Sequence, residues 1–191
     1  MTFPKSIGVF CGSQLGKNPQ FAEAARDVAY AFAKADITLV YGGAKVGIMG
    51  VIADEMVNLK GKVIGVMPKH LVDREIAHPG ITDLRIVNSM HERKSLIAEL
   101  VDGFLMLPGA TGTLDEFVEV LTWAQLGLHQ KPCAILNAAN YYDYLLKFLD
   151  HTVAMEFLNP AYRDMIIVEN SPEKIIEAFV NYQPPAHKWA K

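Results

Sequence analysis

The sequence has 191 residues, of which 51% are apolar and 20% are charged, and its formal net charge is −3. This length suits one compact domain with a substantial core, and the composition excludes a disordered chain. Proteins that bind nucleic acids or anionic membranes usually have a basic surface. A net charge of −3 does not indicate such a surface, so we expect neither partner.

Short apolar runs alternate along the chain with longer segments of helical periodicity. The runs expected to form strands are nearly all apolar, as in strands covered on both faces. They are residues 7–10, 39–41, 63–67, 84–87, 104–107, 134–136 and 166–168. The helical segments are residues 21–35, 48–60, 91–101, 113–126, 142–149 and 172–180. Strand–helix alternation predicts a three-layer, Rossmann-like α/β fold with a doubly wound parallel sheet of about seven strands.

No internal repeat, low-complexity segment or domain linker interrupts this pattern. We expect a single catalytic domain over residues 1–182 and a mobile C-terminal tail at residues 183–191. The longest expected loop spans residues 68–82. The two cysteines lie in different segments, and no signal-peptide pattern or membrane-spanning run of roughly 20 apolar residues occurs, so we expect a cytoplasmic protein.

Glycine-rich loops follow three of the expected strands, at the sheet edge where ligands of parallel sheets bind. They contain Ser13, Gly43 and the run Gly109-Ala110-Thr111-Gly112-Thr113. Glycines let the backbone approach an anion closely, and a helix starting near Thr113 would point free N–H groups at it. Any one of these loops is also explained as an ordinary strand-to-helix turn. Three on one sheet edge favour a phosphorylated ligand.

Two cations, Arg93 and Lys94, stand near the start of the helix expected at residues 91–101. Cations are favoured at the opposite end of a helix, so this position carries a cost unless an anion is close. Arginine offers a planar fork that matches phosphate or carboxylate. The alternative is a solvated surface pair.

Glu116 lies one helical turn beyond the third loop. Together with Thr113 it fits the capping-box pattern T-x-x-E, in which Glu116 would only accept from the Thr113 backbone N–H. The alternative is catalytic, because N-glycoside cleavage passes through an oxocarbenium-like state that a carboxylate stabilises. Asp115 points about 100° away on the helix and suits that task less well. No cysteine or histidine pattern has the spacing of metal ligands, so we expect no metal site.

Taken together, these motifs resemble the LOG (Lonely Guy) family of cytokinin riboside 5′-monophosphate phosphoribohydrolases. The resemblance rests on YGGAKVGIMG at residues 41–50, MHERK at 90–94 and PGATGTLDE at 108–116, and it extends over nearly the whole chain. It implies a Rossmann-like homodimer that acts on a small nucleoside 5′-monophosphate near the subunit interface, with no metal or organic cofactor.

The resemblance also implies roles for individual residues. Arg93 and Glu116 would form the catalytic pair. The residues that would bind the substrate are Ser13, Gly43, Glu75, Lys94, Thr122 and residues 109–113. The family loop usually reads P-G-G-x-G-T, and Ala110 replaces its second glycine. If that position requires a positive φ, alanine costs on the order of 1 kcal/mol; otherwise its methyl group only narrows the approach.

The expected reaction is hydrolysis of adenosine 5′-monophosphates, plain or N6-modified, to the free base and ribose 5-phosphate. Two alternatives stay open: a non-catalytic carrier of a nucleotide or of molybdenum cofactor, and a signalling or scaffold protein that has lost turnover. Relatives of this family have also been labelled lysine decarboxylases. We discount that label, because no lysine stands in a setting typical of a pyridoxal-phosphate Schiff base. The preferred base is not legible in the sequence.

Overall fold

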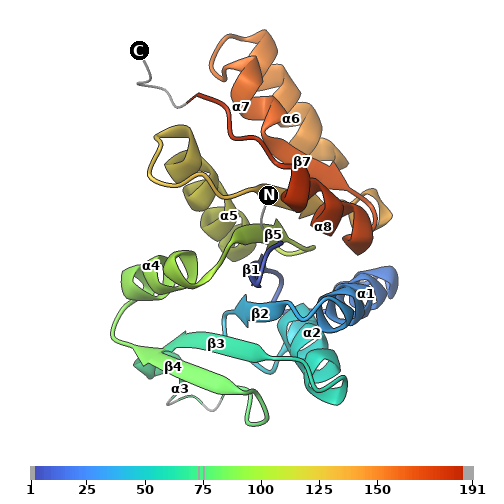
Figure 1. The fold of residues 1–191 in the computed structure, drawn as a ribbon, viewed down its shortest axis with the longest axis vertical. Coiled ribbons are helices and arrows are strands. Elements are labelled where there is room, and N and C mark those ends of the chain that lie inside the picture. Colours follow the sequence, from blue (N-terminus) through green and yellow to red (C-terminus); the bar gives the residue numbers. More distant parts are fainter. Residues whose placement is uncertain (1–2, 73, 75, 187–191) are drawn as a thin grey trace.

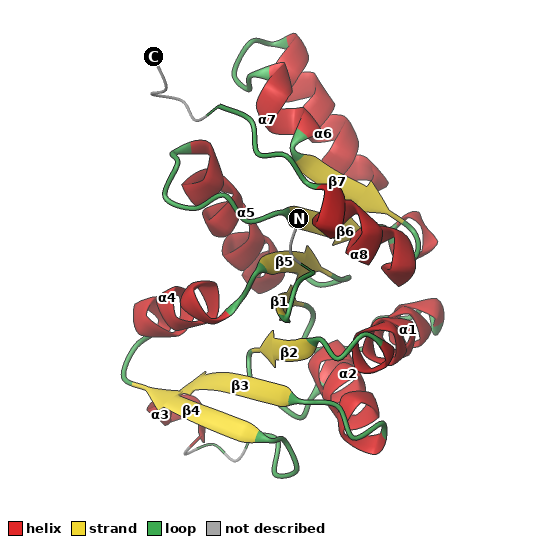
Figure 2. Cartoon of the chain, viewed as in Figure 1, coloured by secondary structure: helices red, strands yellow, loops and turns green. Residues whose placement is uncertain are grey.

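The computed structural model describes residues 3–72, 74 and 76–186. It contains one sheet in which every neighbouring pair of strands is parallel, in the order β4-β3-β2-β1-β5-β6-β7 (Figures 1 and 2). The strands are β1 (Ser6–Phe10), β2 (Thr38–Tyr41), β3 (Val63–Pro68), β4 (Asp83–Val87), β5 (Gly103–Met106), β6 (Cys133–Leu136) and β7 (Ile166–Glu169). The predicted parallel α/β sheet is confirmed.

Helices cover both faces of the sheet (Figure 1). One face carries α1 (Gln20–Lys34), α2 (Gly47–Asn58) and α8 (Pro172–Asn181), and the other carries α4 (Met90–Leu100), α5 (Thr111–Gln125) and α6 (Asp143–Ala154). Successive side chains of a strand point to opposite faces. Leu39 and Tyr41 therefore join the first core, and Val40 joins the second. This burial on both sides explains why the strands are apolar throughout.

Three short elements were not predicted: α3 (Lys69–Val72), η1 (Ala138–Asn140) and α7 (Pro160–Asp164). None exceeds five residues, which is too short for a period to appear in the sequence. The expected loop at residues 68–82 is interrupted by α3 and by an antiparallel bridge between Ala44 and Ala77.

The predicted ends of the domain are only partly described. Residues 183–186 form neither helix nor strand, and the rest of the expected tail lies outside the described residues. Among the described helices, none has the length and apolarity that a bilayer crossing requires.

The order of the strands reverses at β1. From β1 the chain steps outward through β2, β3 and β4, and it then returns to the other side of β1 with β5. Ligands of doubly wound sheets bind at such a switch point, beyond the carboxyl ends of the strands. The loops that follow β1 and β5 meet there, and the Gly12 N–H donates to the Pro108 carbonyl at 3.0 Å.

Candidate active site

A cavity of about 540 Å³ lies at this switch point. The loop after β1, the loop between β5 and α5, and the first turns of α2, α4 and α5 form its walls. The predicted site residues that line it are Ser13, Arg93, Gly109, Ala110, Thr111, Gly112, Thr113 and Glu116. These residues come from three separate segments of the chain, which the fold brings to one cavity.

The structure does not bring the other candidates to the cavity. Gly43 packs against Met67 and Leu84, and Thr122 is exposed on α5, where its hydroxyl donates to the Val118 carbonyl. Their proposed contacts with the substrate are not supported within a single chain. Glu75 lies outside the described residues.

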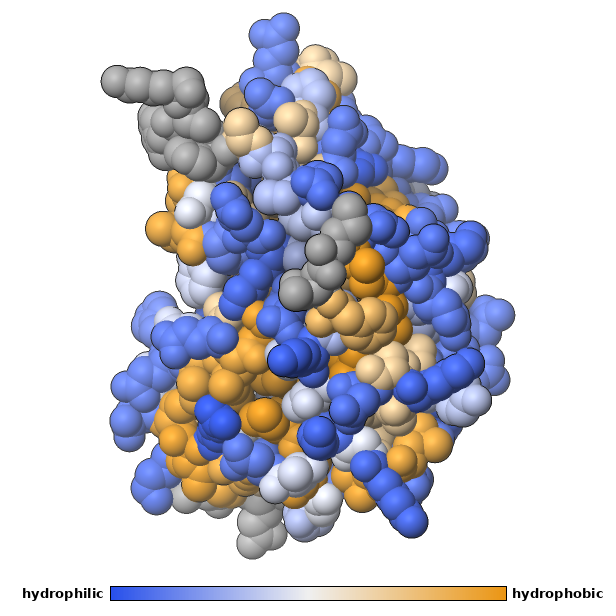
Figure 3. All heavy atoms as spheres, in the orientation of Figure 1, coloured by the Kyte–Doolittle hydropathy of each residue, from blue (hydrophilic) through white to orange (hydrophobic). Residues whose placement is uncertain are grey.

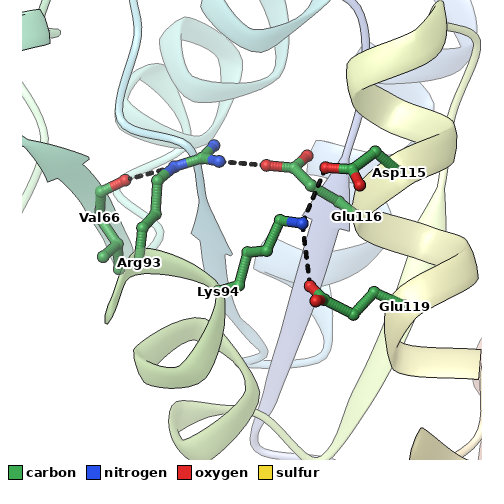
Figure 4. A network of polar contacts seen from close by, with 6 residues as sticks. All are labelled: Val66, Arg93, Lys94, Asp115, Glu116 and Glu119. Atoms are coloured by element: carbon green, nitrogen blue, oxygen red, sulfur yellow. Dashed lines mark hydrogen bonds and ion pairs between the residues drawn. The ribbon is translucent and has the colours of Figure 1, made fainter. Parts of the chain in front are cut away.

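Arg93 and Glu116 form an ion pair in the cavity wall (Figure 4). Arg93 Nη1 donates to Glu116 Oε1, and Arg93 Nε donates to the Val66 carbonyl at 3.0 Å. The two side chains are only 9% and 11% exposed. A buried ion pair adds little net stability, because desolvation offsets the attraction between the charges. Its position in a cavity therefore favours a functional role.

Two readings of these residues are wrong. The solvated surface pair fails because Arg93 is buried. The capping box fails because α5 begins at Thr111, two residues earlier than predicted, and because Glu116 turns to Arg93 instead of to Thr113. The cost of a cation early in α4 is offset by that carboxylate.

Gly42 makes room for this arrangement. A Cβ atom there would collide with Arg93 Nη2 and would lie 3.2 Å from Met49 Sδ. The sequence predicted Gly43 instead, because both glycines stand in one YGG run and no pattern separates them. Gly47, with φ +58°, allows the Ser13 backbone to pass. The second glycine loop thus leaves the space that the Arg93 side chain and the Ser13 backbone occupy.

The start of α5 presents free donors to the cavity. Within the part of the chain that the structure describes, no protein acceptor is found for the backbone N–H groups of residues 110–113. The positive end of the helix dipole lies at the same place. A Cβ atom at Gly112 would meet no heavy atom within 4 Å, so the open space beside it is not needed by the protein's own packing. These features suit a bound anion.

Ala110 fits its position without strain. It is the N-cap of α5, with φ −110° and ψ −149°. A negative φ is accessible to any L-residue, so alanine in place of the usual family glycine carries no left-handed penalty. Ala110 is among the residues that line the cavity.

Lys94 turns away from the cavity toward α5 (Figure 4). Its ammonium lies 2.8 Å from Asp115 and 3.0 Å from Glu119. Desolvation lowers the pKa of Lys94, but hydrogen bonds to Asp115 and Glu119 outweigh it, so the pKa lies above its usual value. Lys94 therefore links α4 to α5, and its ammonium does not line the cavity in which the phosphate is expected.

Cys11 lines the cavity beside the ion pair. Burial, and then the charge of Glu116, raises the pKa of its thiol far above the usual range. A neutral thiol is a poor nucleophile, so Cys11 fits a packing role. In the described ranges, no group of three or more histidine, cysteine, aspartate or glutamate side chains is placed to hold a metal ion.

Comparison with known proteins shows which family the chain resembles. A family model described as "Possible lysine decarboxylase" matches residues 49–179. A cytokinin riboside 5′-monophosphate phosphoribohydrolase of Rhodococcoides fascians is 45% identical over 176 residues, which cover 92% of this chain and 89% of the relative. The enzyme of that name from Arabidopsis thaliana, LOG1, is 40% identical over 186 residues, or 97% of this chain and 87% of the relative. The chain belongs to the LOG family.

Solved structures resemble this LOG-family chain at lower identity. A molybdenum cofactor binding protein from Rippkaea orientalis superposes with a TM-score of 0.69 at 19% identity, covering 92% of this chain and 95% of that one. The molybdenum cofactor carrier protein of Chlamydomonas reinhardtii gives 0.68 at 17% identity, covering 92% and 96%. At such identity, the likeness shows a shared fold alone.

Proposed function

We propose that this LOG-family chain hydrolyses the N-glycosidic bond of an adenosine 5′-monophosphate, plain or N6-modified, and releases the free base and ribose 5-phosphate. One observation carries the proposal: the ion-paired carboxylate of Glu116 and the open N-terminus of α5 face the same cavity. The relatives are phosphoribohydrolases by name, which agrees with this chemistry.

The phosphate binds first in this mechanism. It takes the free N–H groups of residues 110–113, helped by the hydroxyl groups of Thr111 and Thr113. Glu116 follows Thr113 by one turn of α5, so the ribose of an anchored nucleotide comes to lie against its carboxylate. Binding energy from the phosphate is thereby used to place the sugar.

Bond cleavage follows at the anomeric carbon. The bond to the base nitrogen breaks with its electrons going to the base, and the sugar becomes oxocarbenium-like. The carboxylate of Glu116, whose side chain is only 11% exposed, stabilises this positive charge. Water then adds to the anomeric carbon, and its released proton accounts for the proton that the base gains. Arg93 holds Glu116 in place through its guanidinium.

The cavity also has an apolar side. Its apolar lining residues are Leu15, Phe21, Ile48, Met49, Leu71 and Met90. Such a wall accommodates an apolar N6 substituent as well as a plain adenine. No lysine lines the cavity in the described ranges, so a Schiff base with pyridoxal phosphate finds no support.

The decisive experiment is a substrate panel. AMP, isopentenyl-AMP, other nucleoside monophosphates and the matching nucleosides are incubated with the protein, and free base is measured by chromatography. We expect base release from the monophosphates and none from the nucleosides, which lack the anion. Binding without any base release would favour the non-catalytic carrier instead.

A Gly112→Ala substitution separates stability from binding. Alanine should stabilise the first turn of α5 by about 0.5–1 kcal/mol, since no atom obstructs its methyl group. The same methyl group occupies space that the phosphate needs, so KM for AMP should rise. We expect a raised thermal midpoint together with a raised KM. A raised midpoint with an unchanged KM would place the phosphate elsewhere.

We also infer a homodimer, as the resemblance implies. Apolar side chains gather over β4 and the neighbouring part of α4 in Figure 3. Ile86 of β4 is 56% exposed and Met90 of α4 is 41% exposed. Met90 also lines the cavity, so this apolar surface adjoins the cavity. On α5, Val118 and Leu126 flank Thr122 on one exposed helical face.

The proposed dimer is tested by introducing a charged side chain into its interface. Val118→Glu would bury a carboxylate in the proposed interface, so its mass by light scattering should fall from that of a dimer to that of a monomer. Tyr144→Glu, at an exposed position on α6, is the control and should stay dimeric. A monomeric wild-type protein would contradict the inference.

Because Cys11 and Cys133 are both buried free thiols, we further propose a reducing, cytoplasmic location.

A further inference from the structure

Two adjacent tyrosines hold the loop between β5 and α5. The Tyr141 hydroxyl donates to the Gly109 carbonyl at 2.7 Å, and the Tyr142 hydroxyl donates to the Leu107 carbonyl at 2.8 Å. Both come from the turn that follows η1, more than 30 residues along the chain from the loop. The mechanism above does not use either residue.

The two hydrogen bonds have different consequences for the loop. In a trans peptide the carbonyl and the next N–H point in opposite directions. Fixing the Gly109 carbonyl therefore also fixes the N–H of Ala110, which points away from Tyr141. Fixing the Leu107 carbonyl has no such effect, because the next residue, Pro108, has no N–H.

The ring of Tyr141 is itself held in place. It makes edge contacts with Phe21, at 5.2 Å between ring centroids, and with Tyr142, at 4.8 Å. The ring lines the cavity although it is 40% exposed. A side chain at such an exposed position could turn its hydroxyl to water, and these contacts direct it to the loop instead.

We propose that Tyr141 is a positioning residue for the substrate's phosphate: by holding the Gly109 carbonyl, its hydroxyl aims the Ala110 N–H into the cavity. The proposal rests on the phosphate site of the proposed function. Tyr142 acts on the preceding part of the loop, through the Leu107 carbonyl and the Gly109 backbone, and not on the peptide group that carries the Ala110 N–H.

The test removes one hydroxyl at a time and keeps the ring. For Tyr141→Phe we expect KM for AMP and Kd for ribose 5-phosphate to rise about fivefold, as for the loss of one hydrogen bond. We expect kcat to change by less than about twofold. The contact with the phosphate has the same strength in the bound substrate and in the transition state, so its loss should affect KM and not kcat. The thermal midpoint should stay near that of the wild type, because the ring contacts remain.

Tyr142→Phe is the matched control. Its hydroxyl is buried, so its loss leaves the Leu107 carbonyl without a partner and should lower the thermal midpoint. Its Kd for ribose 5-phosphate, measured below that midpoint, should match the wild type. An unchanged Kd in Tyr141→Phe, or an equal rise in both variants, would overturn the proposal.

Failure of the proposed function gives a different result. If the wild type binds ribose 5-phosphate but releases no base, hydrolysis is refuted, and Tyr141 is still judged by its effect on Kd. If the wild type neither binds ribose 5-phosphate nor releases base, both proposals are overturned.

Discussion

Replacing Glu116 with glutamine is expected to lower kcat for base release by about 10²- to 10³-fold, the usual effect of removing one preorganised electrostatic group. Glutamine keeps the shape of the side chain and a hydrogen bond to Arg93, but it removes the negative charge that faces the ribose. Nucleotide binding should persist, because the donors at the start of α5 are untouched. The measurements are base release by chromatography and nucleotide Kd by calorimetry.

Glutamine is preferred to alanine as the primary test. Alanine would leave the buried Arg93 guanidinium without its partner, which costs about 3–5 kcal/mol of stability and would confuse lost folding with lost chemistry. Asp115→Asn is the control on the same helix, because Asp115 contacts Lys94 and is absent from the cavity wall. Undiminished turnover in Glu116→Gln would refute the assignment of Glu116.

Gly42→Ala should reduce kcat/KM about 10- to 100-fold. The added methyl group collides with the guanidinium of Arg93, and overpacking of this kind costs about 1–3 kcal/mol. The displaced guanidinium would position the Glu116 carboxylate less well. Loss of about 1–3 kcal/mol of transition-state stabilisation corresponds to a decrease in kcat/KM of about 10- to 100-fold. Steady-state kinetics and thermal unfolding are measured together, to show whether the substitution lowers kcat/KM, the thermal midpoint or both.

Gly80→Ala is the matched control for that substitution. Gly80 is exposed, and an added Cβ there would lie 3.5 Å from the ring of His78, which is an ordinary contact. We expect wild-type kinetics and an almost unchanged midpoint. If Gly42→Ala behaved in the same way, the position of Arg93 would not be critical for catalysis.

Local patterns in the sequence determined the architecture of this LOG-family chain. Two-sided burial makes a strand such as β2 apolar along its whole length, and this signal lies within a few residues. The glycines, the threonines and the helix start of α5 are likewise adjacent in sequence, so local sequence was enough to propose an anion site there, which stays a prediction. Arg93 was recognisable as a cation at an unfavourable helix position, whereas Glu116 could be read from the sequence either as a capping residue or as a catalytic carboxylate.

The tertiary structure alone decided which groups meet. Arg93 and Glu116 are 23 residues apart, and Lys94 could equally have faced a phosphate until the packing of α4 on α5 gave it Asp115 and Glu119. The space at Gly42 and the hydroxyl of Tyr141 act on residues far along the chain. Charge and hydrogen bonding depend on distances of a few ångströms between atoms, and periodicity in a sequence carries no such distances across loops.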